Sequence, residues 1–313
     1  MINEENIKLI KREEYAEYLL KLSNKAFQNN SFSTICSFLR VGGLQDTNWD
    51  PFEESQKAAE DYNWLLKKSK NCPSKKGQWR IGLLIYCQAI EMTAPHELLA
   101  NILRIVIGEN YHINPFSHLR RVRKKISLNY IPPSTKNKFN YLKELATKSN
   151  ENKLIEFINS FYDDKIRNPF FHSDYIMTDK YFRWTEGGPA QQISLNKVNI
   201  LISNCIEFYS AILWWYKESL KLFGRKLKKY YKWPQYEILE LLSNKENGLY
   251  GFCVHFSNGS KATYSRTKEG TNCTNIRFEK DGSINYFVGS LEALEPVWKI
   301  NGVPINEIKN ISL

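Results

Sequence analysis

The hydrophobic period of the sequence changes once, after Trp233, Pro234 and a short helical stretch at 235–242. Before this point, apolar residues recur at the three- and four-residue spacing of amphipathic helices. After it, short β-branched and aromatic runs alternate with turn residues. Helical runs followed by strand runs are typical of α+β proteins, in which the two kinds of element segregate. We therefore predict a mainly α-helical bundle followed by a small C-terminal antiparallel β-rich domain.

The clearest helical patterns lie upstream of this change. They predict helices at residues 13–25, 51–70, 78–92, 95–107, 115–128, 136–147, 152–162 and 195–223, with a short further helix at 235–242. This distribution predicts three regions: an N-terminal helical segment (1–70), a helical bundle (71–234) and a β-rich domain (235–313).

Three two-residue turn signals mark the β-rich region, namely Asn258-Gly259, Asp281-Gly282 and Asn301-Gly302. Asn-Gly and Asp-Gly readily adopt the left-handed backbone that tight hairpins need. The flanking runs predict strands at residues 249–256, 275–279, 284–288 and 297–300. We expect a small antiparallel sheet there.

Several classes of protein are disfavoured by the remaining features. The polar, acidic start lacks the apolar run of a signal peptide, and the six cysteines form no CxxC pair. Polar residues including Asn204 and Glu207 interrupt the apolar stretch 198–216, which favours a buried bundle helix over a membrane span. No Walker A, G-x-G-x-x-G or G-x-S-x-G motif is present, so we predict no cofactor. We expect a cytoplasmic protein with reduced thiols.

The formal net charge is +11, and two dense basic runs carry much of the excess. The first run contains Arg120, Arg121, Arg123, Lys124 and Lys125, and the second contains Arg225, Lys226, Lys228, Lys229 and Lys232. Tyrosine and tryptophan rings interleave the second run and are suited to stacking on bases. Two alternatives stay open: the runs bind RNA through its phosphates, or they are solvated helix ends.

Between the two basic runs lies the string Arg167-Asn168-Pro169-Phe170-Phe171-His172. Arginine offers a forked, permanently charged donor set for phosphate oxygens, and histidine can exchange protons near neutral pH. Asn168 followed by Pro169 is typical of an N-cap and a first helical residue. This arrangement predicts that His172 lies about one turn inside a helix, near the end that attracts anions.

The string from Ile166 to Tyr175 resembles the signature of HEPN domains, in which an arginine and a polar residue precede a histidine by a short gap. As in several HEPN branches, an extended connector with a Gly187-Gly188-Pro189 turn and a long aromatic-rich helix follow. The resemblance covers about residues 75–223. It implies an all-helical module that cleaves RNA without a metal and pairs two motifs across a homodimer.

The chemistry that follows is attack by the 2′-hydroxyl of RNA on the neighbouring phosphorus. His172 from each protomer would act as base and acid, while Arg167 would stabilise charge on the phosphorane oxygens. Asn168 would cap the helix or hold phosphate. Ser173, Asp174 and Tyr175 are predicted accessory residues that orient the site. DNA lacks the required hydroxyl, and the few nearby carboxylates do not favour a metal site.

Other interpretations remain open. Arg167 could pair with Asp163 or Asp164 at a helix end, with His172 packing beside the neighbouring phenylalanines. The protein would then be a non-catalytic HEPN-like RNA-binding or scaffold protein. A third alternative is a toxin or antiviral defence effector that a regulatory or inhibitor protein holds inactive, because many HEPN ribonucleases act in microbial defence.

Overall fold

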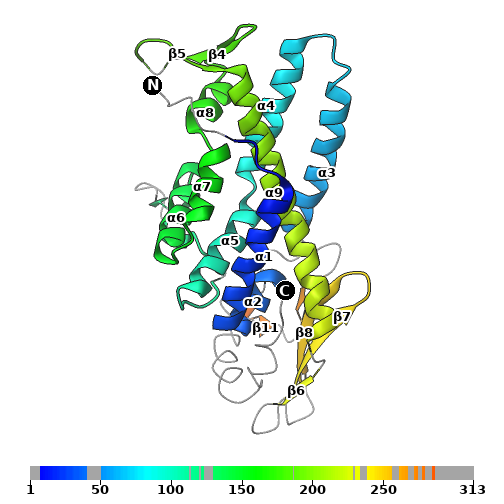
Figure 1. The fold of residues 1–313 in the computed structure, drawn as a ribbon. Coiled ribbons are helices and arrows are strands. Elements are labelled where there is room, and N and C mark those ends of the chain that lie inside the picture. The colour runs from blue at the N-terminus through cyan, green and yellow to red at the C-terminus, as the bar shows by residue number, and fades with distance from the viewer. Residues whose placement is uncertain are drawn as a thin grey trace. The chain divides into compact units, whose positions relative to one another are not determined.

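The protein has an α+β fold made mainly of helices, as the change of hydrophobic period predicts (Figure 1). The computed structural model describes residues 8–40, 51–112, 114–119, 121–122, 130–185, 187–227, 230–232, 238–255, 261–266, 271–273, 277–278 and 284–285. The α-helices among them are α1 (Arg12–Asn29), α2 (Ser31–Leu39), α3 (Pro51–Ser69), α4 (Lys75–Glu91), α5 (Thr93–Val106), α6 (Thr135–Lys148), α7 (Asn152–Phe161), α8 (Asp164–His172) and α9 (Leu195–Lys226).

The strands of the described residues are short and antiparallel. Their bounds are β1 (Arg121–Val122), β2 (Tyr130–Ile131), β3 (Tyr175–Met177), β4 (Tyr181–Trp184), β5 (Gln191–Ser194), β6 (Tyr230–Lys232), β7 (Ile238–Asn244), β8 (Gly248–His255), β9 (Lys261–Arg266), β10 (Thr271–Cys273), β11 (Arg277–Phe278) and β12 (Ile284–Asn285). The largest sheet has the order β10-β9-β8-β7-β6, and a second has the order β3-β4-β5.

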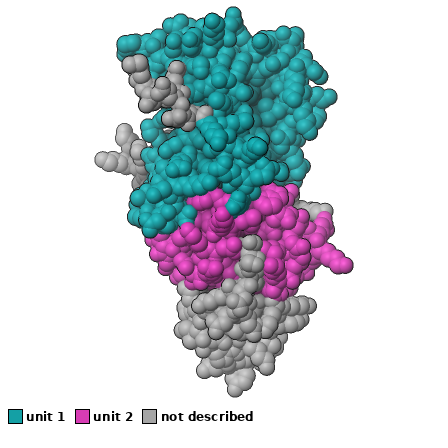
Figure 2. All heavy atoms as spheres, viewed as in Figure 1, with its two compact units in different colours: residues 1–17, 54–96, 116–213 teal, residues 18–53, 97–115, 214–313 magenta. Residues whose placement is uncertain are grey.

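The chain divides into two compact units whose segments interleave along the sequence (Figure 2). Unit 1 contains residues 1–17, 54–96 and 116–213, and unit 2 contains residues 18–53, 97–115 and 214–313. Helices α1, α3, α5 and α9 contribute residues to both units. The expected division into three consecutive regions stays a prediction. The motif residues 167–172 belong to unit 1.

The core of unit 1 is built from aromatic side chains. The ring of Phe208 lies 4.7 Å from that of Phe161 and 5.3 Å from that of Tyr15. His96 is also fully buried, with its ring 4.8 Å from that of Phe139 and its Nε2 atom 2.6 Å from the hydroxyl of Tyr209. These contacts join α1 and α7 to α9, and they join the first residues of α5 to α6 and α9.

Helix α9 is the described helix that is long and apolar enough to cross a membrane, and 61% of its most apolar window is buried within the structure. Asn204, near its middle, is fully buried. Its side chain accepts a hydrogen bond from Ile10 N and donates to Lys8 O and Ser160 O. The amide that interrupts the apolar pattern therefore ties the start of the described chain to the core, as expected of a bundle helix.

In unit 2, the five-stranded sheet holds the end of α2. The hydroxyl of Tyr264 on β9 donates to Leu39 O and to Arg40 O at 2.9 and 2.7 Å, and Arg266 also donates to Leu39 O. Gly248 starts β8 with a left-handed φ of 71°, and a Cβ atom there would overlap the carbonyl group of Leu220. Only glycine fits this position, because it has no side chain and tolerates positive φ.

Two predicted elements are wrong. The helix expected at 235–242 is instead strand β7, because Ile238–Asn244 pairs along its length with β8. The helix expected at 115–128 is replaced by a short 3-10 helix, η2 (Ser117–Leu119), and by β1, while residues 123–129 lie outside the described residues. Tertiary pairing outweighs helical propensity in such short segments.

Several predicted elements of the β-rich region also lie outside the described residues. These are the turns Asn258-Gly259, Asp281-Gly282 and Asn301-Gly302 and the strand expected at 297–300.

Candidate active site

Helix α8 carries the motif, but it begins five residues earlier than expected. Asp163 is its N-cap, and its carboxylate accepts a hydrogen bond from Lys165 N at 2.9 Å. Asn168 is therefore in mid-helix and is not the N-cap, and Pro169 lies inside the helix. A proline there removes one intrahelical hydrogen bond, which the short helix tolerates.

His172 is the last residue of α8, not a residue of its first turn. Ser173 follows with a left-handed φ of 59°, and Asp174 N donates to Pro169 O at 2.9 Å, which closes the helix in the manner of a Schellman motif. The expected position over the anion-attracting end of the helix is therefore wrong. His172 lies at the opposite end, where the helix dipole favours cations.

Arg167 points to α4 and is held there by Glu91. Its Nη2 atom lies 2.7 Å from Glu91 Oε1, and the two side chains are 29% and 33% exposed. Its Nη1 atom donates to Asn168 Oδ1 at 3.0 Å, and its guanidinium lies 4.7 Å from the ring centre of Phe171. The expected alternatives Asp163 and Asp164 are not its partners. These two bonds use one hydrogen of each Nη group, so one hydrogen on each Nη group remains for a phosphate.

Glu91 is in turn fixed by α6. Its second oxygen, Oε2, accepts a hydrogen bond of 2.5 Å from the hydroxyl of Thr135, the first residue of that helix. The end of α4, the start of α6 and the middle of α8 therefore meet at one carboxylate. The contacts of Glu91 matter because an arginine positions a phosphate well only when its own orientation is fixed.

The electrostatic surroundings of the arginine combine burial with nearby carboxylates. Burial raises the pKa of the Cys87 thiol to about 12, with Arg167 acting in the opposite direction and Glu91 adding to the increase. Burial also raises the pKa of Asp163. Asp164 forms an ion pair with Lys136 at 2.7 Å. Cys87 is thus a neutral thiol and does not supply a nucleophile at neutral pH.

His172 and Arg167 are not brought together by α8. Five residues along an α-helix correspond to a rotation of about 140°, so the two side chains leave different faces. His172 is exposed and makes no hydrogen bond or ion pair to the described residues. Asn168, one turn before it, shares its face and is also exposed. One motif therefore presents a fixed guanidinium and, separately, an accessible imidazole.

The accessory residues have structural contacts. Ser173 provides the left-handed C-cap of α8, and Asp174 is exposed. Tyr175 stacks on Phe182 with a ring separation of 5.0 Å and accepts a hydrogen bond from Arg80 Nε at 3.3 Å. Tyr175 therefore connects β3 to β4 and α4, which supports the end of the motif helix.

Most of the predicted RNA-binding residues cannot be placed. Arg120, Arg123, Lys124, Lys125, Lys228 and Lys229 lie outside the described residues, and only the backbones of Arg121 and Lys232 are described. Arg225 and Lys226 are exposed in the last turn of α9. Of the five cysteines whose side chains are described, all are free and four are buried.

Sequence reasoning missed Glu91. The available signal was a glutamate at the end of a run, Leu83 to Ile90, that is apolar except for Gln88, in a segment where acidic residues are rare. No group of three or more histidine, cysteine, aspartate or glutamate side chains among the described residues could hold a metal ion.

No protein-family model, curated protein or solved structure was found to match this chain.

Proposed function

We propose that this protein is a cytoplasmic, metal-independent endoribonuclease of the HEPN type that acts as a homodimer. The observation that carries the proposal is the fixed arginine of α8, held by Glu91 with one hydrogen remaining on each Nη group, on the same helix as the accessible His172. Fixed donors aimed at developing charge are among the largest contributions to catalysis. RNA is the substrate class that best suits Arg167 as a hydrogen-bond donor to phosphate and His172 as a proton-transfer group.

The reaction is an internal transfer at phosphorus. One imidazole accepts the proton of the 2′-hydroxyl, whose oxygen then forms a bond to the adjacent phosphorus. The bond from phosphorus to the 5′-oxygen breaks, and a second imidazole, in its protonated form, gives its proton to that oxygen. The products are a 2′,3′-cyclic phosphate and a 5′-hydroxyl. Arg167 stabilises the added negative charge on the non-bridging oxygens.

A second copy of the chain meets two requirements of this reaction. Each motif supplies one histidine where two are needed, and one α8 directs Arg167 and His172 to different faces. Large apolar side chains are exposed close to His172 in the sequence: Phe171 on α8, Ile176 on β3 and Tyr181 on β4, with exposures of 40%, 69% and 37%. Such side chains are enriched in protein interfaces. Their presence supports dimerisation through the surface formed by the end of α8, β3 and β4.

One observation favours a second function, that of a non-catalytic RNA-binding or scaffold protein. The charge of Arg167 is already partly neutralised by Glu91, and His172 makes no hydrogen bond to Arg167. In that case the motif would be structural and the protein would bind RNA without cleaving it. A role as a toxin or antiviral effector under an inhibitor protein rests on the resemblance to HEPN domains alone.

Incubation of the purified protein with a mixed RNA pool in EDTA separates these two functions. The proposal expects RNA loss with the wild type and not with Arg167→Ala or His172→Ala. Binding to the same pool is measured in parallel by gel shift. Intact RNA in every sample, from a protein that still shifts it, would favour the scaffold function.

A further inference from the structure

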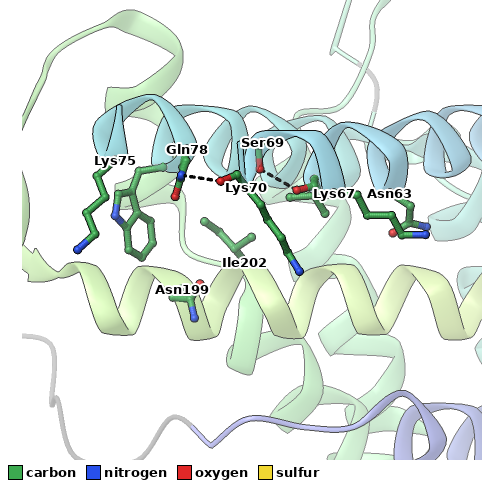
Figure 3. Close-up of a pocket in the computed structure, with 11 residues that line it drawn as sticks. Asn63, Lys67, Ser69, Lys70, Lys75, Gln78, Asn199 and Ile202 are labelled. Atoms are coloured by element: carbon green, nitrogen blue, oxygen red, sulfur yellow. Dashed lines mark hydrogen bonds between the residues drawn. The ribbon is translucent and has the colours of Figure 1, made fainter. Parts of the chain in front are cut away.

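Unit 1 contains a pocket that the motif does not use (Figure 3). It lies among α3, the turn into α4, the first turns of α4 and the N-terminal half of α9, and its volume is about 490 Å³. This volume lies within the range of roughly 300–1,000 Å³ that is typical of small-molecule sites. It is therefore large enough for a ligand of nucleotide size.

The pocket carries positive charge. Three lysines line it, Lys67, Lys70 and Lys75, and no aspartate or glutamate does. The structure gives these three ammonium groups no ion-pair partner among the described carboxylates. In Figure 3, the side chains of Lys70 and Lys75 extend from the α3–α4 hairpin toward α9. Unpaired cations around a cavity attract an anion, and phosphate is a common partner of lysine.

The α3–α4 turn, which begins at Lys70 and is followed by Lys75, is held in place. The side-chain amide of Gln78 donates a hydrogen bond to Cys72 O at 3.1 Å. It donates a second to Lys70 O at 3.4 Å (Figure 3). Ser74 caps α4 by accepting a hydrogen bond from Gly77 N. The lysine side chains therefore start from a defined backbone, which lowers the cost of ordering them around an anion.

The remaining walls suit a flat aromatic ring. Trp79 lines the pocket and is half-buried, and Leu66, Gly82 and Ile202 provide apolar surface. Stacking on an aromatic side chain is the most general way in which proteins hold a nucleobase. The side-chain amides of Asn63 and Asn199 also line the pocket and make no hydrogen bond to the described residues. Each offers donors and an acceptor to a base edge.

This pocket is separate from the motif. Helix α4 contributes Lys75, Gln78 and Trp79 near its start and Glu91 at its end. Thirteen positions, or about 20 Å along a helix, lie between Gln78 and Glu91. Arg80, the neighbour of Trp79, bonds to the accessory residue Tyr175, but no residue of the motif or of its accessory set lines the pocket. The pocket is therefore distinct from the candidate active site in its lining residues.

We propose that this pocket binds a nucleoside phosphate, with its phosphates among the three lysines and its base against Trp79. The proposal does not depend on ribonuclease activity. The three lysines alone would suit inorganic polyphosphate. Trp79, the apolar lining residues and the amides of Asn63 and Asn199 add the features that recognise a base.

The test is calorimetric titration of the full-length protein with ATP, pyrophosphate and adenosine in magnesium-free buffer. We expect ATP to bind at least 10-fold more tightly than either fragment. Replacing Lys67, Lys70 and Lys75 together with alanine should weaken ATP binding more than 10-fold, and Trp79→Leu should weaken it roughly 5- to 100-fold. The lysines are exposed, so their replacement should not disturb folding.

The chain offers a matched control for each variant. Lys68 is an exposed lysine of α3 that does not line the pocket and lies 5.8 Å from the ring of Trp64, which is 58% exposed. Lys68→Ala and Trp64→Leu should bind ATP as the wild type does. Three results would overturn the proposal: absence of ATP binding at millimolar concentration, equal binding by the triple-lysine variant, or equal binding of pyrophosphate. Displacement of ATP by an RNA oligonucleotide would instead assign the pocket to a nucleic-acid strand and would also overturn it.

Titration of His172→Ala with ATP separates this proposal from the ribonuclease function. We expect wild-type affinity from this variant, whether or not the wild type cleaves RNA. Failure of ATP binding together with normal RNA cleavage would reject the pocket assignment alone.

Discussion

Arg167, in the middle of α8, is held by Glu91, the last residue of α4, through a contact of 2.7 Å between Nη2 and Oε1. The opposite oxygen of the same carboxylate accepts a hydrogen bond from Thr135. Glu91 thus determines where the guanidinium points without itself being part of the motif. This relationship makes Glu91 a positioning residue for the proposed reaction.

Replacing Glu91 should affect the rate of RNA cleavage more than stability. Both side chains are about one third exposed, so the ion pair should contribute less than about 1 kcal/mol to the free energy of unfolding. A misdirected arginine can lower the rate by up to roughly 100-fold. We expect Glu91→Ala to reduce kcat strongly, and Glu91→Gln less, because an amide oxygen can still accept the bond.

Glu144→Gln is the control for Glu91, because Glu144 forms an exposed ion pair with Lys148 away from the motif. It should leave both cleavage and unfolding unchanged. Wild-type kcat from Glu91→Ala would show that the contact has no role in positioning.

His172→Ala should slow cleavage strongly without loss of stability. The side chain is exposed and makes no bond to the described residues, so its removal should change the free energy of unfolding by less than about 0.5 kcal/mol. Loss of a proton-transfer group should lower the rate by roughly 10²- to 10⁴-fold. His118, an exposed histidine beside Tyr141, provides the control, and His118→Ala should retain full activity. Equal rates from both variants would remove His172 from the mechanism.

Ile176→Glu should prevent dimerisation and, with it, cleavage. Ile176 is 69% exposed on β3, near the motif, and a charge there would be costly to bury in an interface. Light scattering should report a shift from dimer to monomer. Leu84→Glu, at an exposed apolar position of α4, should remain dimeric. A monomeric wild type that cleaves RNA would contradict the two-histidine mechanism.

Acid should destabilise the protein through His96. Burial, with a smaller effect of Lys138, lowers its pKa from 6.5 to about 3 in the folded state. Between these values the unfolded chain binds a proton that the folded chain does not, so stability is lost as the pH falls from about 6.5 toward 3, by at most about 1.4 kcal/mol per pH unit. Urea unfolding of wild type and His96→Gln at pH 7.5, 6.0 and 5.0 measures the difference. An equal change of the free energy of unfolding with pH in the two proteins would contradict this role of His96.

Asn204 should contribute to stability through its three hydrogen bonds to backbone groups of residues 8, 10 and 160. Asn204→Leu leaves these groups without partners, at a cost of about 2 kcal/mol. Asn199, which is exposed on the same helix, is the matched position, and Asn199→Leu should remain within about 0.5 kcal/mol of the wild type. Equal unfolding midpoints in urea would show that the buried amide is not required.

Hydrophobic periodicity predicted most of the helices because long segments average out local exceptions, as in α9, whose expected start at residue 195 is confirmed. Short segments were less predictable. Helix α2 was missed because its serines and threonine look like turn residues; in the structure, Ser37 and Thr34 bond to carbonyls one turn earlier, and all nine residues are buried. Strand β7 depends on pairing with β8, which local pattern does not reveal.

The candidate site shows the same limit. The motif itself could be identified from residue types, but the start of α8 could not, because Asp163 and Asn168 are both good N-cap residues and Pro169 favoured the wrong one. The partner of Arg167 could not be predicted either. Glu91 is 76 residues away in the sequence, and only the packing of α4 against α8 brings the two together.

The central claim is that the 2′-hydroxyl of RNA attacks phosphorus at a site built on Arg167 and His172. The most direct measurement uses an RNA oligonucleotide that the wild type cleaves in EDTA, and a copy in which the ribose at the cleaved position lacks its 2′-hydroxyl. We predict 2′,3′-cyclic phosphate ends by mass spectrometry from the first oligonucleotide, and no cleavage of the second. Cleavage of the deoxy copy at the wild-type rate, or cleavage by His172→Ala with unchanged ends, would contradict the claim.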